Sequence, residues 1–269
     1  MPFYTDQLMR SVEVLNFPQR IISIVPSQTE LLFDLGLENE VIGITKFCVH
    51  PKTWFQNKTR VGGTKLLNLE KIRELQPDLV IANREENVQE QINELAQDFP
   101  VWVSDIDDMP DALSMITSIG TITGKEEKAN EICQGIIREF RMVREAIHNH
   151  KRAVYLIWKD PFMTVGGDTF INEMLECAGF ANLFKNKTRY PAITLEDIQS
   201  FNFQSKEEDC YILLSSEPYP FNQKHLEELQ AQMTGYKLLL VDGEMFSWYG
   251  SRLQKAPAYF LELHKLLQS

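Results

Sequence analysis

The sequence predicts an α/β protein of two similar lobes with parallel sheets, joined by one long bridging α-helix, with a ligand cleft between the lobes. Three observations lead to this prediction. Continuously apolar runs alternate with helical patterns, which is typical of parallel strands covered on both faces. Segments of the first half recur in the second half. Between the halves lies one long amphipathic pattern.

The first half alternates predicted strands with predicted helices, an order that favours a doubly wound parallel sheet. The expected strands are "RIISIVPS" (20–27), "VIGIT" (41–45), "DLVIAN" (78–83) and "VWVSDI" (101–106). The expected helices are "TELLFDLG" (29–36), "NLEKIRELQ" (68–76) and "NVQEQINELAQDF" (87–99).

Residues 125–150 predict a helix that joins the two halves. Its apolar residues recur at steps of three and four and therefore share one face: Ile132, Ile136, Phe140, Val143 and Ile147. At 1.5 Å per residue, 26 residues would span ~39 Å, about the width of a domain. We therefore expect an N-terminal lobe at 1–124, the bridging helix at 125–150 and a C-terminal lobe at 151–269.

The second half repeats the alternation. Its expected strands are "RAVYLIW" (152–158), "CYILLSS" (210–216) and "KLLLVDG" (237–243), and its expected helices are "TFINEMLECAG" (169–179), "HLEELQAQM" (225–233) and "PAYFLELHKLLQ" (257–268). The repeat is visible in the letters themselves. "NKTRVGGTKLLNLEKI" from Asn57 parallels "NKTRYPAITLEDI" from Asn186, and "TELLFDLGLENEVIG" parallels "TFINEMLECAGFANLF". A spacing of this size indicates two similar lobes rather than a solenoid.

Composition limits the partners. The 269 residues carry a formal charge of −11, which argues against nucleic acid and against an anionic membrane surface. No export signal or membrane-spanning run is evident, so a cytoplasmic location is one expectation. The four cysteines lie far apart, and no phosphate loop, dinucleotide fingerprint, nucleophile elbow or zinc-protease motif is found. We predict no catalytic residues, no intrinsic cofactor and no enzyme activity.

Aromatic side chains concentrate on loops that follow predicted strands, where open α/β folds bind ligands. Such rings suit a large, flat, partly apolar ligand, although each ring could instead close the end of a sheet. The candidate ligand contacts are Phe47, Trp54, Arg84, Trp158, Phe162, Glu244, Met245, Phe246, Ser247, Trp248, Tyr249 and Arg252. Cys48 and His50 could offer an axial ligand to a chelated metal, but two such residues do not complete a metal site.

The sequence resembles substrate-binding proteins of ABC importers for metal chelates, the helical-backbone group for iron–siderophores, haem and vitamin B12. The resemblance is carried by "RIISIVPSQTELLFDLGL", "VIGITKFCVHP", "NLEKIRELQPDLVIANREEN" and "LECAGFANLF", and covers nearly the whole chain. It is closest to the vitamin B12-binding proteins. The resemblance implies a monomer that binds a corrinoid or similar chelate and delivers it to a membrane permease. It also implies a periplasmic or cell-surface location. The opening residues 1–19 resemble the leading hairpin of siderophore binders, so the resemblance implies a hairpin there.

By the same resemblance, Phe47 occupies the position of an aromatic that packs on the corrin ring, and 244–248 matches a loop of the second lobe that closes over it. Glu70 and Glu196 match a pair of glutamates that dock onto arginines of the permease. Two acids at helix starts are also favoured by the helix dipole, so a purely structural role is the alternative. The rival functions are an iron–siderophore or haem binding protein of the same fold, and a cytosolic corrinoid-handling protein.

Overall fold

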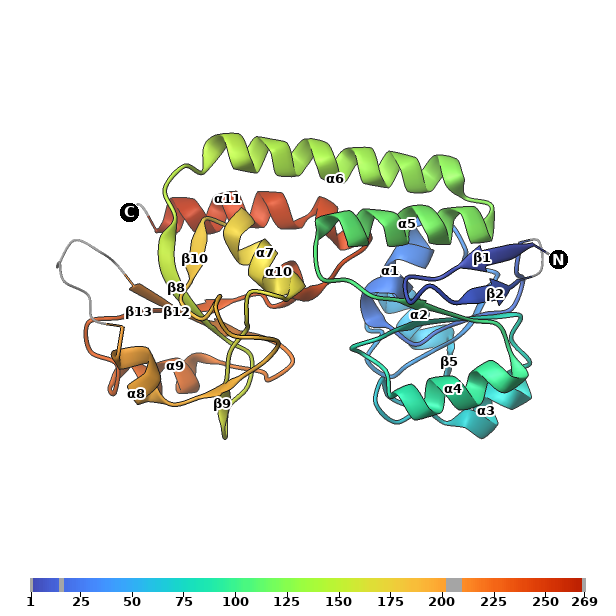
Figure 1. Ribbon diagram of the computed structural model, residues 1–269, viewed down its shortest axis with the longest axis horizontal. Coiled ribbons are helices and arrows are strands. Elements are labelled where there is room, and N and C mark those ends of the chain that lie inside the picture. The colour runs from blue at the N-terminus through green and yellow to red at the C-terminus, as the bar shows by residue number, and fades with distance from the viewer. Residues whose placement is uncertain (1, 15–16, 202–209, 268–269) are drawn as a thin grey trace. The chain divides into compact units, whose positions relative to one another are not determined.

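A computed structural model describes residues 2–14, 17–201 and 210–267. The chain divides into two compact units. Unit 1 consists of Met1–Ile136 and Trp248–Gln254, and unit 2 of Ile137–Ser247 and Lys255–Ser269. Unit 1 therefore includes a short segment that is distant in sequence from its main part, which the expected lobe bounds did not include. Figure 1 labels the elements, and each unit is described separately below.

Unit 1 is built on a five-stranded parallel sheet in the order β5-β4-β3-β6-β7. Its strands are β3 (Ile21–Ser23), β4 (Val41–Ile44), β5 (Thr59–Arg60), β6 (Leu79–Asn83) and β7 (Val101–Ser104). The four longer ones were expected from the apolar runs. The strand residues of β3, β6 and β7 are all buried, as parallel strands covered on both faces should be.

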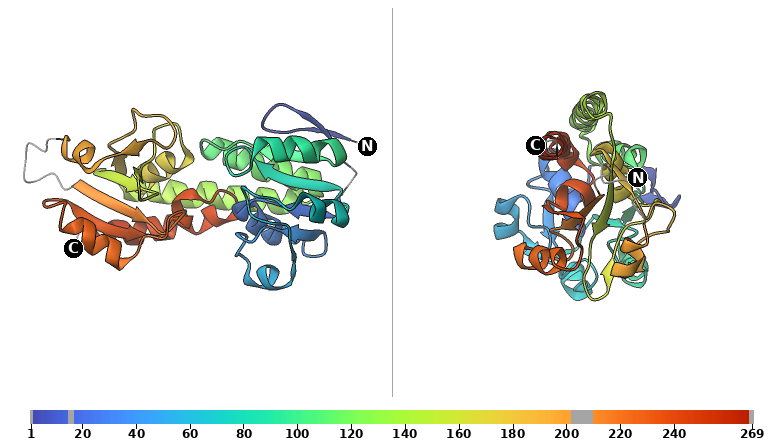
Figure 2. Two further views of the ribbon diagram at one scale, coloured as in Figure 1. Left: turned by 90° about the horizontal axis from the view of Figure 1, so that it is seen from below. Right: turned by 90° about the vertical axis from the view of Figure 1, so that its left-hand side faces the viewer.

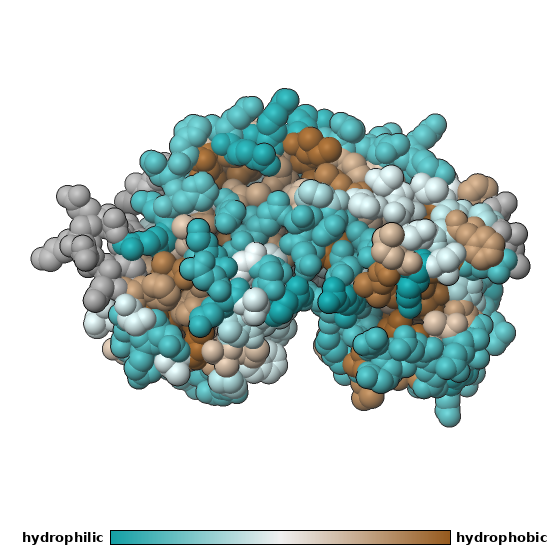
Figure 3. Space-filling view, viewed as in Figure 1, coloured by the Kyte–Doolittle hydropathy of each residue, from teal (hydrophilic) through white to brown (hydrophobic). Residues whose placement is uncertain are grey.

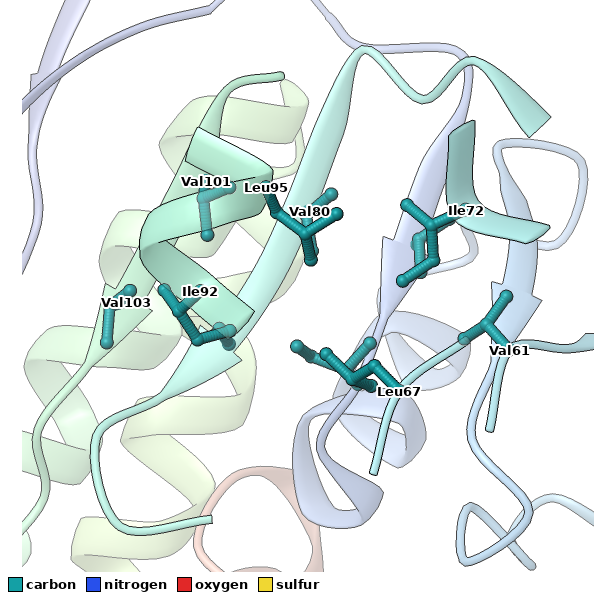
Figure 4. Close-up of a cluster of buried hydrophobic side chains, with 11 residues drawn as sticks. Val61, Leu67, Ile72, Val80, Ile92, Leu95, Val101 and Val103 are labelled. Carbon is teal, nitrogen blue, oxygen red and sulfur yellow. The ribbon is translucent and has the colours of Figure 1, made fainter. Parts of the chain in front are cut away.

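The helices of unit 1 cover both faces of this sheet. They are α1 (Pro26–Asp34), α2 (Lys52–Asn57), α3 (Leu69–Leu75), α4 (Gln89–Asp98) and α5 (Met109–Thr123). Figure 1 shows α3 and α4 on one side and α1 and α5 on the other. One apolar cluster fills the space under α3 and α4, where Ile72, Ile92 and Leu95 meet the strand residues Val80 and Val101 (Figure 4).

A hairpin protects the β7 edge of this sheet. Strands β1 (Phe3–Thr5) and β2 (Ser11–Glu13) pair in antiparallel fashion, as expected for a leading hairpin. The Gln7 backbone N–H donates to the Val103 carbonyl at 3.1 Å. The buried Asp6 carboxylate accepts from the N–H groups of Leu8 and Arg10 and thereby shapes the turn. An edge strand left open would expose unpaired backbone groups, so the hairpin also lowers the risk of aggregation.

Unit 2 is built on a parallel sheet in the order β10-β8-β12-β13. Its strands are β8 (Lys151–Leu156), β10 (Phe180–Asn182), β12 (Cys210–Ser215) and β13 (Lys237–Val241), with a small antiparallel pair β9 (Phe162–Met163) and β11 (Ala192–Ile193). Its helices are α7 (Phe170–Cys177), α8 (Leu195–Gln199), α9 (Gln223–Gln230), α10 (Glu244–Ser247) and α11 (Ala256–Leu266). Figures 1 and 2 show α8 and α9 on the opposite side of this sheet from α7 and α11.

The two sheets share one topology. When β3, β4, β6 and β7 are numbered 1 to 4 along the chain, their order across the sheet is 2-1-3-4. The strands β8, β10, β12 and β13 of unit 2 have the same order. Two parallel sheets in an α/β fold, one in each similar half, confirm the predicted fold class. The helix α6 (Glu126–Ala146) begins in unit 1 and ends in unit 2. All five residues of its predicted apolar face are buried, although the helix ends four residues before the expected bound.

Several elements differ from the sequence expectations. Residues 26 and 27 were expected to end a strand but begin α1, three residues before the expected helix start, because Pro26 at the first helical position has a suitable φ and lacks only an N–H that would be unpaired there. Residues 52–57 form α2 rather than loop. The helix α5 was not expected, although Asp108 caps it by accepting from the Asp111 N–H. Glu244–Ser247 forms the short helix α10.

The surface is mainly polar on the face drawn in Figure 3, which agrees with the formal charge of −11. Among the described residues, no helix is both long enough and apolar enough to cross a membrane.

Candidate ligand-binding site

The carboxyl ends of the unit 1 strands are fastened together by side-chain amides. At this edge β3 and β6 are neighbours, and the chain continues from β3 to β4 on one side and from β6 to β7 on the other. Open α/β sheets bind ligands at such a position. The Asn87 side chain donates to the carbonyls of Ile24 and Thr64 and accepts from the Asn83 N–H. Asn83 in turn donates to the Ser104 hydroxyl at 3.0 Å. These bonds give the loops around the candidate site a fixed frame.

Phe47 is an exposed aromatic residue at this edge of unit 1. It follows β4, and 51% of the residue is exposed. Its ring lies against Gly63, where an added Cβ would be 3.1 Å from a ring carbon. The Lys46 ammonium lies 5.1 Å from the ring centroid. A ring held against the backbone with half of its surface open can receive a flat apolar ligand.

Polar groups lie on the adjoining loops. The Lys65 ammonium donates to the Glu85 carbonyl, and its charge acts on the carboxyl group of Glu86. Burial raises the pKa of Glu86, and the nearby Lys65 charge lowers it by a smaller amount. Lys65 and Glu86 were not singled out from the sequence. Their positions, two residues after Gly63 and three residues after the end of β6, were the available signal.

Arg84, a predicted ligand contact, has a local partner. Its guanidinium lies 2.6 Å from the Asp105 carboxylate, and this hydrogen bond raises the pKa of Arg84. The side chain is 61% exposed, so the pair is screened by solvent and contributes little to stability. Ligand contact at Arg84 stays a prediction.

Trp54 does not present its ring to solvent. It lies on α2, is 1% exposed, and contacts the Phe33 ring edge-to-face at a centroid distance of 5.4 Å. The expectation that it lies on an open loop is therefore wrong, because residues 52–57 form a helix that turns this side chain into unit 1.

Cys48 is also buried. Its sulfur lies 3.1 Å from both the Thr29 and the Thr45 hydroxyl oxygens, and burial raises the pKa of the thiol. A buried, protonated thiol is a poor axial ligand. His50 is partly exposed, and its ring contacts Trp248 edge-to-face at 5.5 Å. Within the described part of the chain, no three His, Cys, Asp or Glu side chains are grouped as a metal site would require.

The segment Trp248–Gln254 packs into unit 1 through a buried ion pair. The Arg252 Nε donates to Glu30 Oε2 at 2.6 Å and its Nη2 to Glu30 Oε1 at 2.9 Å, with side-chain exposures of 6% and 7%. The guanidinium also lies 4.6 Å from the Trp248 ring centroid. Gly250, at a φ of +105°, allows the chain to approach Ser27 on α1. Arg252 is thus a structural residue here, and Trp248 and Tyr249 are largely buried.

The preceding part of the same run belongs to unit 2. Phe246 is fully buried and contacts the rings of Tyr155 and Phe260 at centroid distances of 5.2 and 5.0 Å. It therefore packs in the core of unit 2 rather than on an open loop. The Ser247 hydroxyl donates to the Glu217 carboxylate. Glu244 and Met245 are partly exposed and remain candidate contacts.

Trp158 is the exposed aromatic residue of the unit 2 strand ends. It follows β8 and is 41% exposed. Its ring contacts Tyr219 at 5.6 Å, and the Tyr219 hydroxyl lies 3.2 Å from His225 Nε2. Phe162, on the adjacent β9, is partly exposed. Tyr219 was missed as a candidate, although it follows β12 in the same way that Phe47 follows β4.

The two predicted docking glutamates occupy matching positions. Glu70 is the second residue of α3, after the cap Asn68, and Glu196 is the second residue of α8, after the cap Thr194. Both are exposed. The repeat seen in the sequence therefore corresponds to two helices with the same kind of capped start.

The sequence profile of the periplasmic binding protein family matches residues 21–234. The chain belongs to this family. Members are substrate-binding transport proteins, not enzymes, and are found outside the cytoplasm as periplasmic proteins or lipoproteins. The fold and the family agree with the resemblance drawn from the sequence.

Two curated relatives are similar over most of the chain. An uncharacterized ABC transporter substrate-binding lipoprotein, YvrC of Bacillus subtilis, is 28% identical over 208 residues, which are 73% of this chain and 65% of the relative. A vitamin B12-binding protein of Vibrio campbellii is 29% identical over 188 residues, which are 67% of this chain and 66% of the relative. The matched part thus spans slightly less than two thirds of each relative.

Solved structures show the same fold. The vitamin B12-binding protein BtuF of Vibrio cholerae superimposes with a TM-score of 0.75 at 21% identity, covering 94% of this chain and 98% of that one. The haem-binding protein HutB of Vibrio cholerae gives a TM-score of 0.76 at 18% identity, covering 93% and 99%. At these identities the likeness concerns the fold alone.

Proposed function

We propose that this chain is the substrate-binding component of an ABC importer and that its ligand is a corrinoid. The observation that carries the proposal is the half-exposed Phe47 ring, held against Gly63 at the carboxyl edge of the unit 1 sheet. Two further findings support it. A relative 29% identical to this chain is named a vitamin B12-binding protein, and Trp158 is half-exposed at the corresponding edge of the unit 2 sheet.

The physical reason is the match between a flat macrocycle and a supported aromatic ring. Burying the exposed face of a ring contributes ~25 cal/mol per Å² of apolar surface. Because Phe47 already lies against Gly63, little side-chain freedom is lost when a ligand covers it. Polar groups on the adjoining loops, including Lys46 and Lys65, are placed to orient amide and phosphate groups at the rim. No chemical step is part of this proposal.

Titration of tryptophan fluorescence with cyanocobalamin tests it. Trp54 and Trp102 are buried in unit 1, whereas Trp158 is half-exposed and is the expected reporter. We expect saturable one-to-one quenching that is reduced in amplitude in Trp158→Phe. Phe47→Ala should weaken binding about tenfold or more, since a buried phenyl ring is worth about 1.5–3 kcal/mol.

The matched control is Phe3→Ala. Phe3 is 67% exposed on the hairpin of unit 1, away from the strand ends, so its removal should leave the affinity unchanged. Equal affinity of Phe47→Ala and the wild-type protein would remove Phe47 from the site. An absence of quenching at micromolar cyanocobalamin would reject the corrinoid while leaving the family in place.

Haem is the second candidate ligand, favoured by the partly exposed His50 three residues after Phe47. A haem complex would show a strong Soret band, and axial ligation would be lost in His50→Ala. Because the His50 ring also contacts Trp248, thermal unfolding of the variant should be recorded in parallel. An iron–siderophore would bind without either signature.

Delivery to a permease is proposed to use Glu70 and Glu196. Two exposed carboxylates at capped helix starts, one in each unit, could pair with basic side chains of a membrane partner. The proposed location is outside the cytoplasm. Cell fractionation tests it, and recovery in the cytosol would favour a corrinoid-handling protein instead.

A further inference from the structure

A cavity that is widely open to solvent lies in unit 1, at the edge of the sheet opposite the candidate ligand site. Its volume is about 540 Å³. Arg20 precedes β3, Val41 begins β4 and Thr59 begins β5, so the cavity lies at the amino ends of three parallel strands. Phe47 follows the carboxyl end of β4 and does not line it. The two sites are therefore separated by the length of the strands.

Two cations line this cavity, Arg20 and Lys58, and among the described residues neither forms an ion pair with a carboxylate. The Arg20 Nε donates to the carbonyls of Leu75 and Gln76 at 3.2 and 3.0 Å, which leaves Nη1 available. The Lys58 ammonium donates to the Glu38 carbonyl and lies 5.1 Å from the Trp54 ring centroid. Burial lowers the pKa of Lys58, with Glu38 and Glu40 opposing the shift. An anionic group in the cavity would stabilise both cations.

Glu38 supplies a negative charge in the same cavity. Its carboxylate is exposed and acts on Lys58 electrostatically. Asn39 and Asn57 add neutral amides that can donate or accept, and both are exposed. The floor is apolar, formed in part by Val41 and Leu75. A simple anion would meet repulsion from Glu38, and a simple cation would meet repulsion from Arg20 and Lys58.

We infer that this cavity binds a small organic zwitterion, with its phosphate or carboxylate group at Arg20 and Lys58 and its ammonium group at Glu38. The volume is larger than an inorganic phosphate needs and lies within the range of small-molecule sites. The carbon chain between the two charged groups would lie over the apolar floor. This inference does not depend on the proposed corrinoid function, because it concerns the other edge of the sheet.

Calorimetric titration with three probes tests the inference: O-phosphoethanolamine, inorganic phosphate and ethanolamine. We expect saturable binding of the zwitterion and at least tenfold weaker binding of each half. Lys58→Gln should weaken binding of the zwitterion about tenfold, because it removes a charged hydrogen-bond donor to the phosphate. Lys58→Arg, which keeps the charge, should retain most of the affinity and controls for damage to the fold.

Glu38→Gln separates the zwitterion from a simple anion. It should weaken O-phosphoethanolamine and strengthen inorganic phosphate, because one repulsive charge is removed. Phosphate that binds the wild-type protein as tightly as the zwitterion would overturn the assignment. So would an absence of saturable binding, or equal affinities in all variants. Cyanocobalamin titrations of the same variants should be unchanged, so failure here is distinguishable from failure of the corrinoid proposal.

The same chemistry occurs in the headgroup of phosphatidylethanolamine. Sedimentation with vesicles of phosphatidylethanolamine and phosphatidylcholine, compared with phosphatidylcholine alone, identifies the source. Lys58-dependent binding to the first vesicles would assign the site to a lipid headgroup, and binding of the soluble probe alone would assign it to a free metabolite. Both results support a zwitterion site.

Discussion

The two sheets share a strand order but differ in the loops at their carboxyl ends. In unit 1 the chain leaves β3 and enters α1 directly at Pro26. In unit 2 the chain leaves β8, exposes Trp158 and forms β9 before it enters α7. The sheets consist of buried apolar strands, which tolerate few substitutions, whereas the exposed aromatic rings lie on the loops. The difference shows that the repeated sequence determines the strand order of both sheets, whereas the candidate ligand contacts lie on loops that differ between the units.

The run "EMFSWYGSR" makes the same contrast within nine residues. Phe246 packs in the aromatic core of unit 2, whereas Trp248 and Arg252 pack in unit 1. Neighbouring residues of one short run therefore stabilise different units.

Removing one partner of the buried ion pair should give the largest effect. Glu30→Gln leaves the buried Arg252 charge uncompensated, which costs about 3–5 kcal/mol in comparable sites. We expect the loss in unit 1, because both residues belong to it. Hydrogen exchange resolved by segment would show faster exchange in α1, with unit 2 much less affected. The double variant Glu30→Leu, Arg252→Leu removes both charges and should recover most of the stability.

The exposed pair of Arg73 with Glu94 and Asp98 provides the control. These side chains are 38–49% exposed, so solvent screens the charges and Arg73→Ala should change stability little. A Glu30→Gln protein as stable as Arg73→Ala would show that the buried pair does not hold the segment.

The sequence could predict β3, β4, β6 and β7 of unit 1 and β8, β12 and β13 of unit 2, because burial on both faces leaves an unbroken apolar run. It did not predict the short strands β5, β9, β10 and β11, which have too few residues to show such a run. It could not place Arg252. Its partner Glu30 lies 222 positions away, and nothing in either local pattern signals the pair. The prediction for Trp54 was wrong for a different reason. The short α2 has too few residues to show helical periodicity, so the sequence did not indicate which side chains it buries. The matching capped starts of α3 and α8 could be predicted because they repeat in the sequence, whereas the docking role of Glu70 and Glu196 stays a prediction.

The two tryptophans that were both expected to contact ligand should now behave differently. Trp54→Ala removes a fully buried ring and should destabilise unit 1 by about 3–5 kcal/mol. Trp158→Ala removes a half-exposed ring and should cost much less stability while weakening ligand binding. Denaturant unfolding and cyanocobalamin titration of both variants measure the contrast. Equal loss of stability in the two variants would contradict the structural assignment.

Reversing the charge of Glu70 or Glu196 compares the contributions of the two units to uptake through the permease rather than to stability. Glu70→Arg and Glu196→Arg should each leave cyanocobalamin affinity within about twofold, since exposed surface changes are usually within ±0.5 kcal/mol. Each should reduce uptake supported by the permease. Glu74→Arg, on the same helix as Glu70 but in the last turn, is the matched control. Normal uptake in both reversed variants would remove these residues from the docking surface.

The smallest expected effect concerns the two caps themselves. The Asp197 carboxylate accepts from the Thr194 N–H at 2.7 Å and from its hydroxyl at 3.0 Å, and these bonds lower the pKa of Asp197. A carboxyl group whose pKa is lower in the folded state stabilises that state above its unfolded pKa of about 3.9. The contribution is lost as the pH falls through the folded value. In α3 the position of Asp197 is taken by Lys71, and the cap Asn68 accepts from the Lys71 N–H through a side-chain amide that does not titrate.

Acid should therefore loosen the start of α8 before that of α3. Amide chemical shifts recorded between neutral pH and pH about 3 would show this as a titration at Thr194, with little change at Lys71. Asp197→Asn abolishes the titrating group, so the Thr194 shift should then become independent of pH. A Thr194 titration that persists in Asp197→Asn would assign the acid sensitivity to another carboxyl group. If Thr194 instead follows Lys71 in the wild-type protein, the two capped starts are equivalent in acid, and the comparison between the units would rest on their loops alone.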